Sequence, residues 1–338
     1  MQIESGAKHG EIGIEDMDEI EEARSAQYAR TDSARAHFYT GHAQDTRRWR
    51  LEPDDAEFLR AVATRPLIDR ALLSNEPVRK FFAHAFIDAL LADHREHPDR
   101  FRVFGTIAWD LPLTWEWAPG IDTVSMRNIA SQHLRRCAID GVGIVEIDTW
   151  KEIAGEPGKR IVPHIHFLGW SKTGEAIDAN ALERKMRGRR ALPNSLGAPS
   201  VVVKAVGQSA QDLATIGCYL SKPPAYAKNP VPHRSRPGFD LAQVEHAPGS
   251  VTRLIEVLSY MEVGDVIFSI GEGKSIAREI RDRVREQLAQ HRRGVTAPTR
   301  EEIAAHWRRI RSINGNRRFE DCNIITRAAQ RGTGDPGD

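Results

Sequence analysis

The sequence predicts an α+β protein in which an antiparallel sheet lies between helical segments. Residues 54–98 repeat apolar side chains at spacings of three and four, which is the periodicity of amphipathic helices. Residues 100–228 instead alternate short β-branched and aromatic runs with helical runs. We therefore divide the chain into a disordered acidic segment (1–50), a helical segment (51–99), a mixed core (100–228) and a loop followed by basic helices (229–338).

Composition excludes several classes of protein. No run approaches the roughly 18 apolar residues of a membrane helix, and the first residues lack a signal pattern, so we expect a cytoplasmic protein with no membrane partner. The three cysteines show no CxxC spacing, which argues against a disulfide framework or a structural zinc site.

The net charge is +1, but the charges are unevenly distributed. Residues 1–24 carry eight acidic and two basic side chains, and this acidic composition predicts disorder. Residues 274–331 carry fifteen basic and seven acidic side chains. These basic helices either contact DNA or are ordinary solvated helical faces.

In the helical segment, Pro66 and Pro77 stand where first helical turns would begin, which predicts two or three packed helices. The core then predicts strand 102–110, helix 123–139, strand 141–149, a turn near Gly155, strand 160–169, helix 179–186, strand 200–206 and helix 211–222. The first six elements have the order of a ferredoxin-like (RRM-like) unit, whose sheet holds its first and third strands at the centre.

Beyond this core, a proline-rich loop follows residue 228. Helices are predicted over 251–261, 274–291 and 299–311. Thr299 and Glu302 have the spacing of a capping box, which would open the last of them.

The third core strand contains His164 and His166, whose side chains point to one face because strand residues alternate. A hairpin turn near Gly155 would place Glu146 opposite His164 on that face. Two imidazoles and a carboxylate suit Mg²⁺ or Mn²⁺ and leave positions for a phosphate oxygen. A one-residue slip in the pairing of the two strands would turn Glu146 to the other face. Asp148 lies on the same side of its strand as Glu146 and is the reserve candidate for the carboxylate ligand. A pair of structural histidines is the alternative.

Tyr219 and Lys222 are three residues apart on a predicted helix and therefore share one surface. A cation beside a phenol lowers the pKa of that phenol or neutralises charge developing on a phosphate. A packed tyrosine and a solvated lysine at the helix end are the alternative. A metal site together with a tyrosine nucleophile suggests phosphodiester transesterification.

These motifs resemble those of the HUH endonuclease superfamily, which comprises rolling-circle replication initiators, relaxases and related single-strand transposases. PHIHFLGW is similar to the family's histidine-hydrophobic-histidine motif and GCYLSKPP to its tyrosine motif, over roughly residues 100–228. The histidines precede the tyrosine, which is the order in replication initiators. A second tyrosine, found in some phage initiators four residues earlier, is replaced by Thr215, so a single catalytic tyrosine is expected.

The resemblance implies a metal-dependent nickase. A metal held by His164, His166 and Glu146 would polarise the scissile phosphate of single-stranded DNA, and Tyr219 would attack it. The products would be a 5′-phosphotyrosine link and a free 3′-hydroxyl, with Lys222 stabilising the charge. A plasmid or phage initiator would act on origin or hairpin DNA, alongside a host helicase and polymerase.

Basic and aromatic residues near these motifs are candidate nucleic-acid contacts. They are Trp170, Lys172, Lys185, Arg187, Arg189 and Arg190. Core packing is the alternative for Trp170, and Tyr226 is interpreted as a loop or packing residue. Gly271 to Ser275 resembles the end of a phosphate-binding loop, but Phe268 replaces its required glycine, so no fused helicase is expected.

Two other functions stay open. A single-strand transposase or relaxase would use the same chemistry in another DNA context. A non-catalytic DNA-binding regulator would have an HUH-like fold without activity, although retention of both histidines, Tyr219 and Lys222 argues against it.

Overall fold

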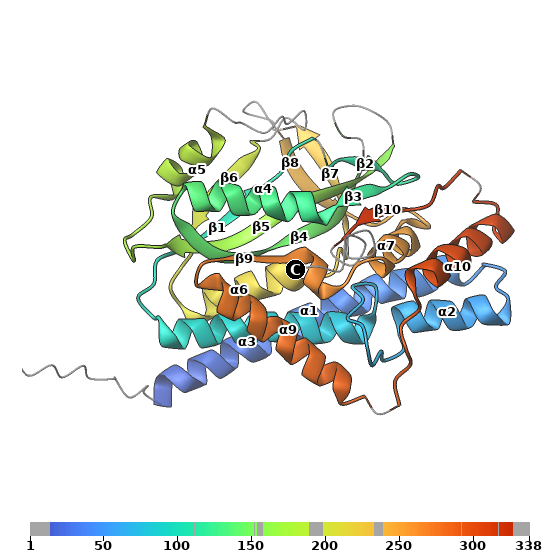
Figure 1. Ribbon diagram of the computed structural model, residues 1–338, viewed down its shortest axis with the longest axis horizontal. Coiled ribbons are helices and arrows are strands. Elements are labelled where there is room, and N and C mark those ends of the chain that lie inside the picture. The colour runs from blue at the N-terminus through green and yellow to red at the C-terminus, as the bar shows by residue number, and fades with distance from the viewer. Residues whose placement is uncertain are drawn as a thin grey trace, which may run out of the picture.

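A computed structural model of the chain has the predicted α+β class, with helices packed on both faces of a curved mixed sheet (Figure 1). It describes residues 14–110, 112–151, 153, 158–188, 199–232, 239–291, 293–316 and 318–326. The helices are α1 (Ile14–Thr46), α2 (Pro53–Ala63), α3 (Glu76–Glu96), α4 (Thr123–Arg136), α5 (Ala179–Arg187), α6 (Ala210–Ser221), α7 (Ser250–Ser259), α8 (Val263–Val266), α9 (Gly273–Ala289) and α10 (Arg300–Ile313). The strands are β1 (Arg102–Ile107), β2 (Thr114–Trp115), β3 (Gly120–Asp122), β4 (Ile139–Lys151), β5 (Lys159–Ser171), β6 (Val201–Ala205), β7 (Ala227–Pro232), β8 (Phe239–Val244), β9 (Ile267–Ile270) and β10 (Asn323–Ile325).

The main sheet has the strand order β6-β1-β5-β4-β7-β8, with β2 added to β5 and β9 added to β4. The pairs β6-β1, β1-β5 and β5-β4 are all antiparallel. Strand β5, which carries both histidines, therefore has a neighbour on each side, as the sequence predicts. A site on β5 can draw side chains from β1 and from β4.

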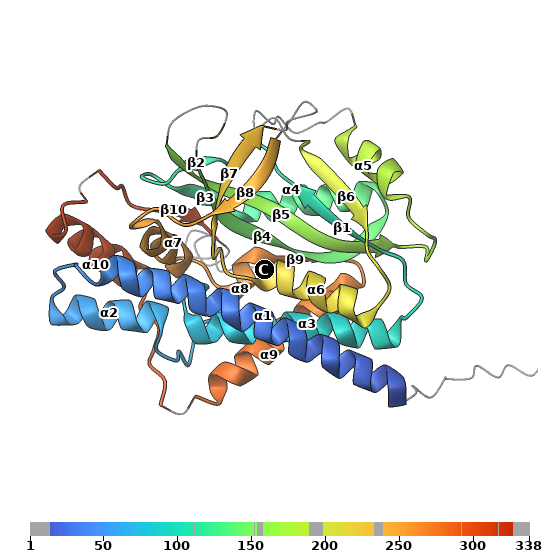
Figure 2. The ribbon, with the colours of Figure 1, turned by 180° about the vertical axis from the view of Figure 1, so that it is seen from behind.

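Helices cover the two faces of this sheet unequally (Figures 1 and 2). Helices α4 and α5 lie on one face, whereas α6, α3, α1 and α9 are stacked on the other. Helix α6 contacts β4 and β5 directly and is itself in contact with α3 and α1. The tyrosine helix is thus held between the sheet and a second layer of helices.

Local capping signals account for where several helices begin. The Asn75 side chain accepts a hydrogen bond from the Val78 amide and opens α3. The predicted capping box of Thr299 and Glu302 is present at α10. Helix α6 ends before Pro223, since the residue preceding a proline favours extended dihedrals, and Lys222 has φ −56° and ψ 147°.

The prediction of a disordered segment over residues 1–50 is wrong for residues 14–46, which form α1. Residues 1–13 lie outside the described residues. Buried positions of α1 recur at helical spacings of three, four and seven residues, but polar side chains occupy several of them, which hid the helical pattern. They are Ile20, Ala23, Gln27, Thr31, Phe38 and His42. Contacts with α3, α6 and α7 make these positions interior.

The loop predicted after residue 228 is instead a β-hairpin of β7 and β8. Pro230 and Pro232 are tolerated in β7 because this strand pairs with β4 only at Trp150 and Lys228. The rest of the β7 edge that faces β4 forms no ladder hydrogen bonds, so it does not need the amide protons that proline lacks. The turn expected at residues 155–157 lies outside the described residues. None of the described helices is long and apolar enough to span a membrane.

The loop that resembles a phosphate-binding motif is packed against the sheet. The Glu272 amide donates to the Asp140 carboxylate at 3.1 Å. A Cβ on Gly273 would lie 2.0 Å from the Gly141 carbonyl oxygen. An amide of this loop is therefore already paired with a carboxylate of β4, and the loop packs tightly on that strand.

Candidate functional site

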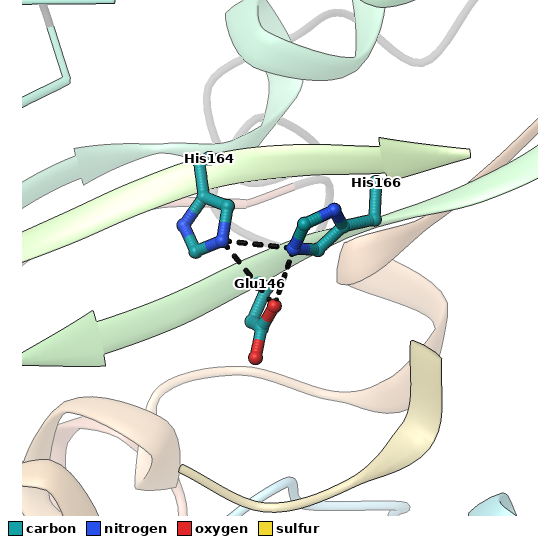
Figure 3. Close-up of side chains that lie close together, drawn as sticks. All are labelled: Glu146, His164 and His166. Carbon is teal, nitrogen blue, oxygen red and sulfur yellow. Dashed lines mark hydrogen bonds and ion pairs between the residues drawn. The ribbon is translucent and has the colours of Figure 1, made fainter. Parts of the chain in front are cut away.

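Glu146, His164 and His166 form a buried cluster on two neighbouring strands (Figure 3), on the face of the sheet where His166 contacts Tyr219 of α6. The predicted register is confirmed, because Glu146 on β4 pairs directly with His164 on β5. All three side chains are at most 5% exposed. Their nearest ligand atoms lie within 4.8 Å of one another, so the cluster can hold a metal ion.

The distances within the cluster suit a small cation. The two Nε2 atoms are 2.9 Å apart, and Oε2 of Glu146 lies 2.6 Å from Nε2 of His166 and 3.3 Å from Nε2 of His164. Adjacent ligands about 2.1 Å from an octahedrally coordinated ion would be separated by about 3.0 Å. The three side chains are therefore already spaced as neighbouring ligands of one ion.

Hydrogen bonds orient the two imidazoles. Nδ1 of His164 lies 3.0 Å from the Val162 carbonyl oxygen, which can only accept, so this nitrogen carries the proton. Nε2 of His164 faces Nε2 of His166. Nδ1 of His166 lies 2.9 Å from the Thr106 hydroxyl on β1. A proton on Nε2 of His166 or a metal cation satisfies the lone pairs that converge here.

The protonation states favour metal binding. Burial lowers the pKa of His166 to about 4, so its ring is neutral near pH 7. Burial opposes ionisation of Glu146, but the ammonium groups of Lys222 and Lys228 outweigh it and hold the pKa of Glu146 well below its usual value. Oε2 of Glu146 faces Nε2 of His166 at 2.6 Å, whereas Oε1 accepts no hydrogen bond from the described side chains and lies 3.7 Å from Nζ of Lys222. A carboxylate and a neutral imidazole are the forms that bind a cation.

Tyr219 lies beside this cluster on the last turn of α6. Its ring packs edge-on against the His166 ring at 5.0 Å, and Phe104 of β1 contacts both rings at 5.4 Å. Tyr219 is half-buried. The predicted tyrosine and the predicted metal ligands therefore meet, although they come from elements about fifty residues apart.

Lys222 joins the tyrosine to the cluster. Its Nζ lies 3.6 Å from the centroid of the Tyr219 ring and 3.7 Å from Oε1 of Glu146. Burial and the charge of Glu146 raise the pKa of the Tyr219 phenol, whereas Lys222 and Lys228 lower it. The phenol is therefore protonated near pH 7 and lies within reach of two cations that stabilise its ionised form.

The reserve ligand Asp148 lies on the same face of β4 but has another partner. Its Oδ2 is 3.9 Å from Nε2 of His164 and accepts a hydrogen bond from Nζ of Lys228 on β7. Burial lowers the pKa of Lys228, but Asp148 and Glu146 raise it well above its usual value, so the pair is ionic. Asp148 is thus neutralised by Lys228, while Glu146 is directed at the histidines.

A cavity of about 240 Å³ opens next to Tyr219. Its walls come from α1, β4, α6, the segment after α6 and the β7-β8 hairpin. Tyr219 lines this cavity and also contacts His166, so its ring lies between the candidate metal ligands and an open space.

The predicted nucleic-acid contacts are not gathered at this site. Lys172 and Lys185 are exposed, but Lys185 is on α5, which covers the opposite face of the sheet. Arg187 on the same helix donates to the Val201 carbonyl oxygen at 2.8 Å. Arg189 and Arg190 lie outside the described residues.

The interpretation of Trp170 as a base-stacking residue is wrong. Its side chain is 2% exposed, its Nε1 donates to Glu272 at 3.3 Å, and the Arg100 guanidinium lies 4.7 Å from its ring centroid. These neighbours leave no open face for a base.

Two further residues of the site, Thr106 and Lys228, were not predicted from the sequence. Thr106 pairs with His166 across β1 and β5, and the central position predicted for the histidine strand was a usable signal for this contact. Lys228 lies in a proline-rich stretch without strand periodicity, so no sequence signal placed it against Asp148.

Comparison of the chain with known protein families, curated proteins and solved structures found no match.

Proposed function

We propose that this chain is a metal-dependent nickase of single-stranded DNA that acts through Tyr219. The observation that carries the proposal is the contact between a three-ligand cluster and a tyrosine with a lysine over its ring. A structural histidine pair alone would need neither the carboxylate nor the lysine. A tyrosine nucleophile needs both a site for the phosphate and a cation near the phenol.

In the proposed reaction, the phenolic oxygen of Tyr219 forms a bond to phosphorus and the bond from phosphorus to the 3′-oxygen breaks. The phenol loses one proton and the departing 3′-oxygen gains one, so the products are a 5′-phosphotyrosine link and a free 3′-hydroxyl. Lys222 stabilises the negative charge on the phenol during attack. Phe104 and His166 hold the ring in place. When bound at the cluster, Mg²⁺ or Mn²⁺ would polarise a phosphate oxygen and offset the charge of Glu146.

Two features favour an HUH nuclease of the rolling-circle initiator type, from a plasmid or a phage. We propose that β1, α4, β4, β5, α5 and β6 form a ferredoxin-like unit, because their strand order β6-β1-β5-β4 places the first and third strands at the centre. The histidines precede Tyr219 in the chain, as in replication initiators. A relaxase or single-strand transposase would share this chemistry, and its DNA context would distinguish it.

The test is covalent adduct formation. The protein is incubated with single-stranded DNA from its own replicon and Mn²⁺, then separated on a denaturing gel. We expect an adduct that is lost with chelator and in Tyr219→Phe. Tyr28→Phe is the matched control, because it removes one hydroxyl at the contact with Asp88 on α3, outside the site. It should retain the adduct.

Two outcomes would contradict the proposal. An adduct that persists in Tyr219→Phe would exclude this residue as the nucleophile. Intact DNA binding with no adduct from any segment of the replicon would favour the non-catalytic regulator instead.

A further inference from the structure

We propose that the cavity beside Tyr219 binds one nucleotide that flanks the scissile phosphate, with its phosphate at Arg30 of α1 and its base against Tyr226. This inference rests on the proposed function, because it takes single-stranded DNA as the ligand. It assigns substrate binding to an N-terminal helix and to a segment after the tyrosine motif.

The charge of the cavity favours an anion. Three cations line it, Arg30, Lys222 and Lys228, against one carboxylate, Asp148. Lys228 is paired with Asp148, and Lys222 lies 3.7 Å from Glu146. The positive charge of Arg30 is therefore in excess at the entrance to the site.

Arg30 is the cation best placed to accept a new partner. It is exposed on α1, and no acidic side chain of the described residues lies within ion-pair distance of it. Burial raises the pKa of the Cys218 thiol, while Arg30 and Lys222 lower it, so both cations approach the same side chain of α6. A planar guanidinium that has no acidic partner among the described residues is suited to phosphate.

Part of the cavity lining is apolar. It consists of Pro223, Pro224, Ala225 and the ring of Tyr226. Tyr226 is 38% exposed, and its ring stacks on His37 of α1 at 4.6 Å. An aromatic ring fixed from one side and exposed on another is a surface for base stacking, which is tolerant of sequence.

The dimensions and position select the occupant. A cavity of about 240 Å³ is smaller than the roughly 300–1,000 Å³ of sites for drug-sized ligands, so its occupant is expected to be no larger than one nucleotide unit. Tyr219 forms part of its wall, so a strand whose scissile phosphate reaches the phenol would place a flanking nucleotide here. The same phosphate chemistry could be met by a free inorganic phosphate, which the experiment distinguishes.

The experiment measures binding of a fluorescent mixed-sequence single-stranded oligonucleotide by anisotropy in a Tyr219→Phe background with chelator, so that no cleavage occurs. Arg30→Gln should weaken binding roughly fivefold to tenfold. The slope of log K for binding against log salt concentration should also become less negative by about 0.7. This is the contribution of one phosphate contact on a single strand.

Arg135→Gln is the matched control for Arg30→Gln. Arg135 is exposed on α4, on the opposite face of the sheet, and the variant removes the same charge. Tyr226→Leu should weaken binding of the normal strand roughly tenfold, but should leave binding of an abasic strand unchanged, which a general structural defect would not do.

Three results would overturn the assignment of the cavity. They are unchanged binding by Arg30→Gln, equal losses in Arg30→Gln and Arg135→Gln, or inorganic phosphate binding that depends on Arg30 while DNA binding does not. Failure of the proposed function is a separate outcome. In that case, the otherwise unsubstituted protein would form no adduct, yet Arg30→Gln would still weaken binding of the single strand.

Discussion

Metal binding at the Glu146, His164 and His166 cluster should raise the thermal stability of the protein. The ligand atoms are already 2.6 to 3.3 Å apart, so binding requires little rearrangement of the fold. An ion that binds only the folded state at 100 times its dissociation constant stabilises that state by about 2.7 kcal/mol. At about 2 °C per kcal/mol for a chain of this size, the expected increase in Tm is about 5 °C.

The assay is thermal unfolding followed by circular dichroism, with chelator-treated protein before and after addition of Mn²⁺. Glu146→Gln preserves the shape of the side chain but removes its charge, and should abolish most of the increase. His133→Gln is the matched control, because His133 is also a buried histidine but lies on α4, across the sheet. An equal increase in the Glu146→Gln variant would refute the assignment of these ligands.

Three further predictions concern the fold that supports the site. Burial lowers the pKa of His42 to about 4, so the unfolded state binds an extra proton between about pH 6.5 and 4. This group should contribute up to about 3 kcal/mol to the loss of stability as pH falls through this window. His42→Asn should make that part of the curve less steep in urea titrations, and the remaining slope includes His166, whose pKa is also lowered to about 4. Phe38→Ala removes a fully buried ring of α1 and should lower the free energy of unfolding by about 3 to 5 kcal/mol in the same titration. An unchanged free energy of unfolding would show that α1 is not part of the folded unit. Gly105→Ala would place a Cβ 2.1 Å from the Phe167 ring and should cost about 1 to 3 kcal/mol, whereas Gly120→Ala, with no atom nearer than 3.9 Å, should cost less in parallel melts.

The sequence by itself determined the parts of the site that depend on local periodicity. His164 and His166 share a face because side chains alternate along a strand, and a hairpin between β4 and β5 placed Glu146 opposite His164. The helical spacing of Tyr219 and Lys222 likewise put both side chains on one surface. These relations follow from backbone geometry over a few residues or from the register of one hairpin.

Only the tertiary structure decided which distant residues meet, both at the site and in the fold around it. Helix α1 has polar residues at buried positions, and His42 is satisfied by Thr252, a partner 210 residues away. Lys228 reaches Asp148 because the β7-β8 hairpin joins the edge of β4. Trp170 is buried because Arg100 and Glu272 cover it. The partners in each case come from other parts of the chain, and no local pattern of hydrophobicity encodes such contacts, because burial of a polar side chain depends on what lies opposite it.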